Sequence, residues 1–174
     1  MRFVLAALVA ANLVLCTVPA RAVELETIAK AAAEYHDSNP RLEAMYRAAL
    51  LNTSQQATIA PDGTAYVKTG DIPAEWLRDA SAQVRPYLFF AKQDPQVASL
   101  LRGIIAREAK YLQVDPYANA FTIDYRVWEQ KFELDSLAYP IVLAWSYWKA
   151  TGDSSIFTGD ESLGFDRALE TMER

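Results

Sequence analysis

The sequence predicts an all-α fold in which helices form two layers, one inside the other. Apolar residues recur at helical spacing over most of the chain, which is typical of amphipathic helices. The segment 94–114 carries its apolar residues on one side, whereas 132–150 is apolar nearly all round. A helix without a polar face must be covered on all sides. The segment 132–150 is therefore expected to be an inner helix, wrapped by outer helices such as 94–114.

The first 22 residues have the pattern of a secretory signal peptide. Arg2 supplies a positive end, residues 3–15 are apolar except for one asparagine, and Ala20-Arg21-Ala22 is a small-x-small cleavage sequence. The apolar run is short for a membrane-spanning helix. We expect residues 1–22 to be removed and residues 23–174 to form one exported domain, periplasmic or secreted, with no membrane attachment after cleavage. An uncleaved anchor is the alternative.

Charge and composition exclude several classes of partner. Removing Arg2 and Arg21 from the 17 basic residues leaves 15 against 22 acidic ones, a net charge of −7. Such a chain is not expected to bind nucleic acid or an anionic membrane. Cys16 is the only cysteine and His36 the only histidine, so neither a disulfide framework nor a multi-histidine metal site is predicted. We expect no metal and no cofactor.

The first part of the exported chain is predicted to hold two helices and a short strand. Residues 25–37 form the first helix, and Pro40 is suited to the opening turn of the second. Residues 52–63 are polar and predict a loop. The run 64–68 has the composition of a strand.

The remaining helices are predicted at 71–92, 94–114, 132–150 and from about 165 to 174. Asp71 is a good N-cap for the first of them, and Pro86 should break it. Gly152 should end the apolar helix. The helix at 94–114 has a polar side opposite its apolar stripe, made of Arg102, Arg107 and Lys110. The segment 115–121 contains a proline and is expected to be a loop.

Trp76, Arg78 and Asp79 form the first candidate binding set, in the opening turns of the helix at 71–92. An indole has a flat apolar face with a polar edge, while arginine and aspartate make fixed hydrogen bonds. Sugar rings have apolar faces and hydroxyl rims, so the set suits a sugar. The alternative is a buried Arg–Asp pair that only ties the helix to its neighbour.

A second polar set precedes the apolar helix. Glu133 and Asp135 lie at its amino end, where the helix dipole favours carboxylates. They either point into a central cavity or only compensate the dipole. Tyr117 and Asn119, in the preceding loop, could reach the same ligand or merely close a turn. The residues alone leave both questions open.

Four linked segments carry a family resemblance. They are TGDIPAEWLRDASAQVRPYL, DPYANAF, WEQKFELDSLAYP and YWKATGD, within a match that runs from about residue 42 to residue 153. In this order they resemble glycoside hydrolase family 125, the metal-independent exo-α-1,6-mannosidases of bacteria and fungi. The resemblance implies a partial (α/α)6 toroid, with roughly the first five helices of a six-hairpin ring. The chain departs from the family at Glu75, where methionine is usual.

The resemblance also implies inverting hydrolysis that removes terminal mannose from glycans. It places the catalytic acid and base beyond Arg174, so the isolated chain is expected to be inactive. The residues that it implies for gripping a mannose-containing oligosaccharide are Trp76, Arg78, Asp79, Tyr117, Asn119, Glu133 and Asp135. The helix at 132–150 would expose an apolar flank where later helices should pack, which favours aggregation. Two alternatives are a non-catalytic exported helical domain that binds glycans, and a six-hairpin glycosidase for another sugar, such as an α-glucoside.

Overall fold

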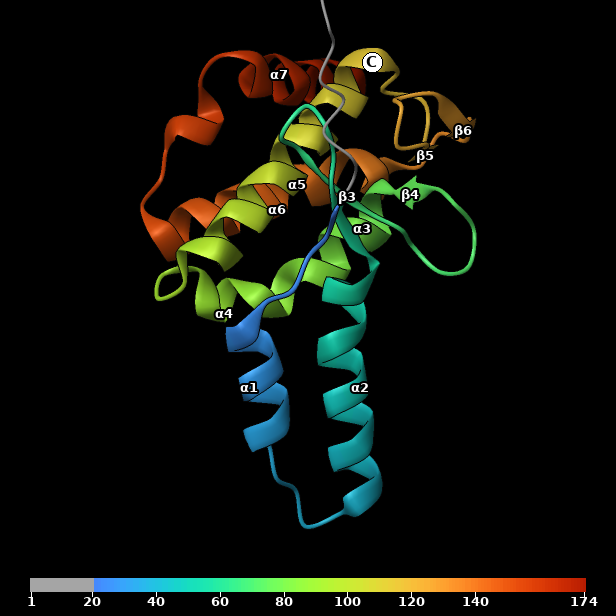
Figure 1. Cartoon of the computed structure of the whole chain (residues 1–174). Coiled ribbons are helices and arrows are strands. Elements are labelled where there is room, and N and C mark those ends of the chain that lie inside the picture. Colours follow the sequence, from blue (N-terminus) through green and yellow to red (C-terminus); the bar gives the residue numbers. More distant parts are fainter. Residues whose placement is uncertain (1–20) are drawn as a thin grey trace, which may run out of the picture.

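Helices packed around a central helix, α5, make up most of the computed structural model, which describes residues 21–174 (Figure 1). The predicted signal peptide lies outside the described residues, except for Arg21 and Ala22. The helices are α1 (Glu26–Glu34), α2 (Pro40–Gln56), α3 (Leu77–Val84), α4 (Leu88–Ala91), α5 (Pro95–Val114), α6 (Leu134–Thr151) and α7 (Asp160–Met172), with 3-10 turns at Arg85–Tyr87 and Ser155–Phe157. None of these helices is long and apolar enough to cross a membrane.

Two small antiparallel sheets connect the helices, and the sequence predicted only one of their strands. One sheet contains β1 (Arg21–Ala22), β2 (Ala57–Ile59) and β3 (Ala65–Val67), and the other contains β4 (Glu75–Trp76), β5 (Ala120–Phe121) and β6 (Val127–Glu129). The predicted loop at 52–63 is therefore wrong in part, because α2 continues to Gln56 and β2 follows. The predicted loop at 115–121 likewise ends in β5. Strands of two or three residues are too short to show a period of two.

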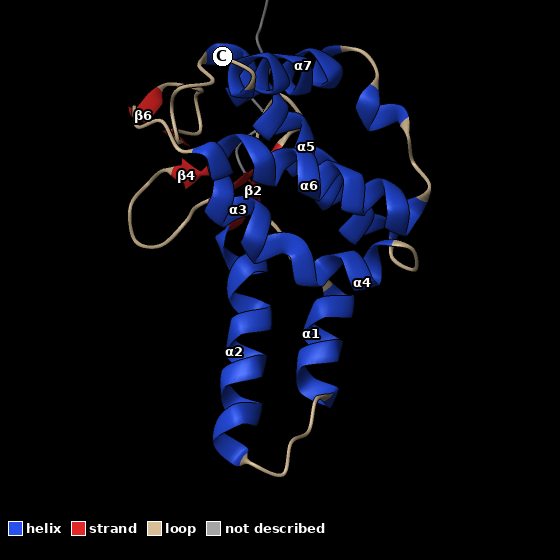
Figure 2. Ribbon diagram, turned by 180° about the vertical axis from the view of Figure 1, so that it is seen from behind, coloured by secondary structure: helices blue, strands red, loops and turns tan. Residues whose placement is uncertain are grey.

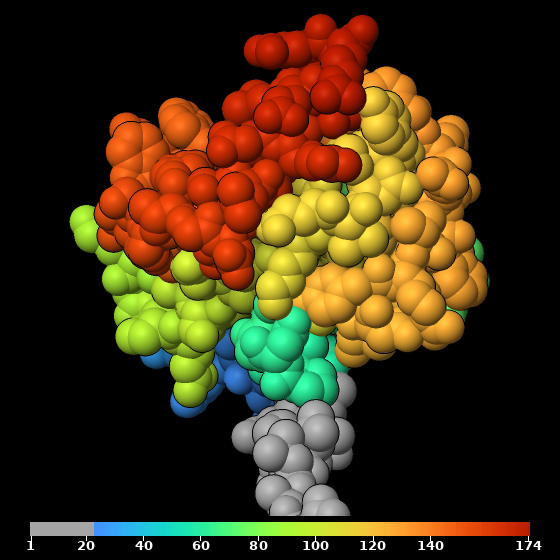
Figure 3. All heavy atoms as spheres, turned by 90° about the horizontal axis from the view of Figure 1, so that it is seen from above, coloured from blue at the N-terminus to red at the C-terminus, as the bar shows by residue number. Residues whose placement is uncertain are grey.

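The central helix α5 is closely packed on several sides. It begins after Asp94, whose carboxylate accepts hydrogen bonds from the backbone N–H of Gln96 and Val97 at 2.7 and 3.3 Å. α5 contacts α4, α6, α7 and β3, and Figure 3 shows α7 lying across it. Gly103 lets β3 approach, since a Cβ there would lie 3.0 Å from the Ala65 nitrogen. The predicted helix at 94–114 is confirmed.

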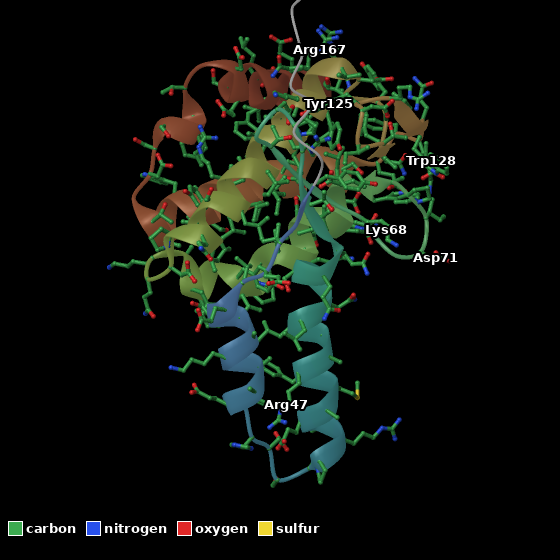
Figure 4. The ribbon with its side chains drawn as sticks, viewed as in Figure 1. Arg47, Lys68, Asp71, Tyr125, Trp128 and Arg167 are labelled. Atoms are coloured by element: carbon green, nitrogen blue, oxygen red, sulfur yellow. The ribbon has the colours of Figure 1, made fainter. Side chains whose placement is uncertain are left out.

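The helices α1 and α2 form an arm that projects from the body of the molecule (Figures 1 and 2). Arg47 lies between them (Figure 4), donates two hydrogen bonds to the carbonyl of Tyr35 at 2.9 and 3.2 Å, and pairs with Glu43 at 2.7 Å. Tyr35 also stacks on Tyr46, with ring centroids 3.9 Å apart. These contacts join the two helices of the arm near its tip.

Several predicted helix boundaries need correction. The helix expected at 71–92 begins only at Leu77, because Asp71 lies in a turn and β4 intervenes. Its break is confirmed, since a 3-10 turn contains Pro86. The first helix ends at Glu34 rather than at residue 37, and the last begins at Asp160 rather than near 165. Gly152, with a φ of 80°, ends α6 as predicted.

The apolar helix α6 is not covered on every side. Leu137, Leu143 and Ala144 are fully buried, but Trp145 is 54% exposed, and Leu134, Val142 and Trp148 are also open to solvent. Near this side of α6, Phe89 of α4 is 83% exposed and lines the same groove as Trp145. The prediction of complete burial is therefore wrong for this chain by itself, whereas the expected apolar flank is present.

Candidate functional site

Six of the seven predicted site residues converge where two helices begin beside the second sheet. α3 follows β4 directly and packs against α6. β4 pairs with β5, which pairs with β6, so that Trp76 lies opposite Ala120 and Ala120 opposite Glu129. This places the amino ends of α3 and α6 next to residues 119–133 at one end of the molecule, where Figure 2 shows β4 and β6 close to α3.

Arg78 joins the two helices through an open ion-pair cluster. Its Nη1 donates to Asp135 Oδ2 at 3.1 Å, and its Nη2 donates to Asp79 Oδ2 at 3.2 Å. The hydrogen bond to Asp135 and the charge of Asp79 raise the pKa of Arg78 above its ordinary value. The predicted alternative is correct in that the arginine ties α3 to α6. It is wrong about burial, since the three side chains are 38–43% exposed.

Asn119 gathers two carboxylates and the indole into a second cluster. The side chain of Asn119, which is 1% exposed, donates to Glu129 Oε2 at 2.6 Å and to Glu133 Oε2 at 3.2 Å. Trp76 Nε1 donates to the same Glu129 oxygen at 3.0 Å. The predicted placement of Trp76 in a helix is wrong, since it stands on β4, and the strand is what brings its indole to Glu129.

The two glutamates of this cluster are held in their charged form. Hydrogen bonds from Trp76 and Asn119 lower the pKa of Glu129. A hydrogen bond from Lys131, at 2.7 Å, is the main cause that lowers the pKa of Glu133. A general acid for glycoside cleavage needs a raised pKa. Glu129 and Glu133 are therefore suited to accepting hydrogen bonds and not to donating a proton.

Two of the predicted site residues each have one side-chain oxygen without a hydrogen-bond partner. Asn119 Oδ1 and Asp135 Oδ1 are both shielded from solvent and accept no hydrogen bond. Leaving a buried polar atom unsatisfied costs about 1–3 kcal/mol, so each of these oxygens favours a donor that approaches it. Hydroxyl groups are such donors, and the indole of Trp76 adds an apolar surface with a polar edge.

The structure separates Tyr117 from the other predicted residues and adds one that was missed. Tyr117 is 44% exposed and packs against Phe132, with ring centroids 5.8 Å apart. The missed residue is Glu129, which links Trp76 to Asn119. The sequence could have indicated Glu129 through its position in the segment WEQKFELD, which also holds Glu133 and Asp135. Only the pairing of β5 with β6, however, brings Glu129 to the site. Within residues 21–174, no group of three or more potential metal ligands is present.

Comparison with known proteins identifies the family. The family described as metal-independent alpha-mannosidase (GH125) matches residues 39–126 and 122–174, and the chain belongs to this family. The resemblance predicted from the sequence is thereby confirmed.

A solved structure and a curated relative agree with this assignment. The structure is of a Streptococcus pneumoniae member of a family of metal-independent alpha mannosidases, in a non-productive complex with alpha-1,6-mannobiose; it is 34% identical with a TM-score of 0.72, over 83% of this chain and 37% of that one. This likeness confirms the predicted helical fold class. The meiotically up-regulated gene 157 protein of Schizosaccharomyces pombe is 40% identical in an alignment 129 residues long that covers 62% of this chain. The chain spans 25% of that relative's length.

Proposed function

We propose that this chain supplies the sugar-recognition part of an exported, inverting, metal-independent α-mannosidase that removes terminal mannose from glycans. The observation that carries the proposal is the pair of unsatisfied acceptors, Asn119 Oδ1 and Asp135 Oδ1, one in each of the two hydrogen-bonded clusters at the start of α3 and α6. Family membership supports mannose as the sugar, and the solved relative was studied with alpha-1,6-mannobiose.

Each side chain of the site has a distinct task in this proposal. The face of Trp76 covers the apolar side of the sugar ring, and hydroxyl groups donate to Asn119 and Asp135. Arg78 holds Asp135 at a distance of 3.1 Å. Asp79 and Asp135 share this one guanidinium, which orients their carboxylate groups, and in this proposal they accept hydrogen bonds from sugar hydroxyls.

The catalytic acid and base belong to another part of the family domain in this proposal, so the isolated chain turns over no mannoside. Two observations support this separation: the lowered pKa values of Glu129 and Glu133, which do not suit a general acid, and the 37% of the solved relative that the chain covers. A chimera in which residues 39–174 replace the matching segment of that relative should hydrolyse an α-1,6-mannobioside. If the chimera folds and binds mannobiose without hydrolysing it, a non-catalytic glycan-binding domain becomes the better assignment.

Binding by the purified chain tests the recognition step directly. We expect α-1,6-mannobiose to shift NMR resonances of residues 76–79 and 119–135, and isomaltose, an α-1,6-linked glucose disaccharide, to bind more weakly. Trp76→Leu should weaken mannobiose binding about tenfold, because it removes an aromatic face and a charge-assisted hydrogen bond.

Trp128→Leu is the matched control, since this indole is 49% exposed. Within residues 21–174 it makes no hydrogen bond to Glu129 or Asn119, unlike the indole of Trp76. Equal losses in the two variants would refute the assignment to Trp76. Preference for isomaltose would instead support an enzyme acting on α-glucosides.

A further inference from the structure

The hairpin formed by β5 and β6 carries site residues at its open end and a different cluster at its closed end. Asn119 precedes β5 and Glu129 ends β6, and the Asn119 N–H donates to the carbonyl of Glu129 at 3.2 Å. At the closed end the chain reverses through a turn in which Tyr125 N–H donates to the carbonyl of Thr122 at 3.1 Å. The register shifts by a bulge between Ala120 and Phe121.

Tyr125 occupies a backbone conformation that its residue type disfavours. Its φ of 64° makes it the only residue other than glycine with a positive φ among residues 21–174. A hairpin turn followed by one left-handed residue ordinarily takes glycine at that position. A tyrosine there stores about 1–3 kcal/mol of strain, which persists only if contacts of the side chain offset it.

The phenol of Tyr125 makes such contacts with the other small sheet and its turn. Its hydroxyl donates to Asp62 Oδ2 at 2.5 Å and lies 3.2 Å from Thr64 Oγ1. The ring packs under the guanidinium of Arg107, 4.4 Å from its centre, and Figure 4 shows Tyr125 close to β3 and α5. The hydrogen bond from Tyr125 and those from Thr64 lower the pKa of Asp62 in spite of its partial burial, so the acceptor is charged.

Arg107 extends this attachment into the core. The helix pattern predicted Arg107 on the polar side of α5, but the residue is fully buried. Its Nε donates to Thr64 Oγ1 at 3.0 Å, and its Nη1 donates to the carbonyl of Ile123, within the hairpin turn, at 2.9 Å. The closed end of the hairpin is therefore fixed to α5 by a side chain that water does not reach.

We propose that Tyr125 is a positioning residue, which latches the closed end of the hairpin to Asp62 and Arg107 and thereby holds Asn119 and Glu129 against Trp76. The latch and the site lie at opposite ends of the same two-stranded unit, whose middle is fixed by stacking of Phe121 on Tyr111 at 4.4 Å. Freeing the closed end lets the strands move as a unit about this middle contact. That the latch matters for sugar binding rests on the proposed function. That it positions Asn119 and Glu129 against Trp76 does not depend on that function.

The hydrogen bond from the Trp76 indole to Glu129 reports the position of the hairpin without any ligand. The indole N–H of Trp76 gives a separate NMR signal, which is assigned by its loss in Trp76→Phe. The rate at which this proton exchanges with water measures how often the hydrogen bond to Glu129 opens. Tyr125→Phe keeps the ring and removes the bond to Asp62, and we expect exchange about tenfold faster, as one lost charged hydrogen bond implies. Tyr125→Gly relieves the backbone strain, keeps the turn, and should accelerate exchange at least as much.

Tyr147→Phe is the matched control, because it removes a 3.3 Å tyrosine–aspartate hydrogen bond on α6, to Asp153, away from the hairpin. Faster Trp76 exchange in both Tyr125 variants, and not in this control, supports the latch. Unchanged exchange in both Tyr125 variants, or an equal change in the control, overturns it. If exchange responds as expected but the wild-type chain binds no mannobiose, the latch stands and the proposed function fails.

Discussion

Two arginines of this chain bind carboxylates and hydroxyls in contrasting surroundings. Arg107 is fully buried, and its donors are divided among Thr64, Tyr111 and the carbonyl of Ile123. Arg78 has a side chain that is 43% exposed and pairs with two aspartates. A buried arginine fixes the elements around it, because each unmet bond there is expensive. An exposed arginine contributes little to stability and leaves its aspartates accessible to a ligand.

The largest difference is expected when each arginine is replaced by methionine. Arg107→Met leaves Thr64, Tyr111 and the carbonyl of Ile123 without their donor. Because each unmet buried partner costs about 1–3 kcal/mol, the free energy of unfolding should fall by about 3–5 kcal/mol. Arg78→Met should lower it by less than about 1 kcal/mol. Urea denaturation followed by circular dichroism measures both values, and similar losses would show that the contrast between the two arginines is unfounded.

The buried surroundings of Arg107 also predict how stability depends on pH. Glu75, fully buried, accepts hydrogen bonds from the Val67 N–H and the Tyr111 hydroxyl, at 3.2 and 2.9 Å. Burial raises its pKa from 4.5 to about 8, although Arg107 opposes the shift. The folded chain thus prefers the protonated form, and stability is greatest below the unfolded pKa and falls as the pH rises through about 8.

Glu75→Gln, which cannot ionise, should remove much of this fall. The free energy of unfolding, measured by urea titration at about pH 5 and about pH 9, should differ by a few kcal/mol in the wild type and by less in the variant. Burial likewise raises the pKa of Glu108, with the same sign, so part of the dependence remains. Stability of the wild type that rises over this interval would contradict the assignment.

The contrast between the arginines explains how far the sequence could predict the structure. The period of α5 was visible because many apolar residues share one face, and Asp94 marked its start. The same pattern placed Arg107 on the polar side, because a helical period does not reveal that β3 and the hairpin cover that side. In the sequence Glu75 is a departure from the usual methionine, and alternation along β4 turns it into the core and Trp76 toward Glu129.

The candidate site was predicted by residue type and assembled by contacts that no local pattern encodes. Six of the seven predicted residues meet there, since Glu129 joins Trp76 to Asn119, Asn119 also binds Glu133, and Arg78 joins Asp79 to Asp135. Glu129 escaped because its role depends on pairing between strands of two and three residues. Strands as short as these are fixed by tertiary packing and not by propensity.

A subtler test separates recognition from stability within the open cluster. Asp135→Asn keeps the shape of the side chain and removes its charge, so the free energy of unfolding should change by less than about 1 kcal/mol. Mannobiose affinity should fall about tenfold, because a charged acceptor forms stronger hydrogen bonds than an amide oxygen. Titration by NMR measures the affinity. Glu170→Gln, a change on α7 at an exposed position, is the control, and retained affinity in Asp135→Asn would remove this residue from the site.

Salt should produce the smallest effect and should act on only one of the two arginines. At about 1 M salt the screening length is about 3 Å, so the ion pairs of Arg78 no longer contribute their small stabilisation. The Arg78→Met variant should then have the same urea midpoint as the wild type. The destabilisation caused by Arg107→Met should persist, because ions do not enter the packed interior around Thr64 and Tyr111. Parallel urea titrations at low and high salt measure both differences. If salt reduced the effect of Arg107→Met as strongly as that of Arg78→Met, water and ions would have access to Arg107, and the latch at Tyr125 would lose its buried anchor.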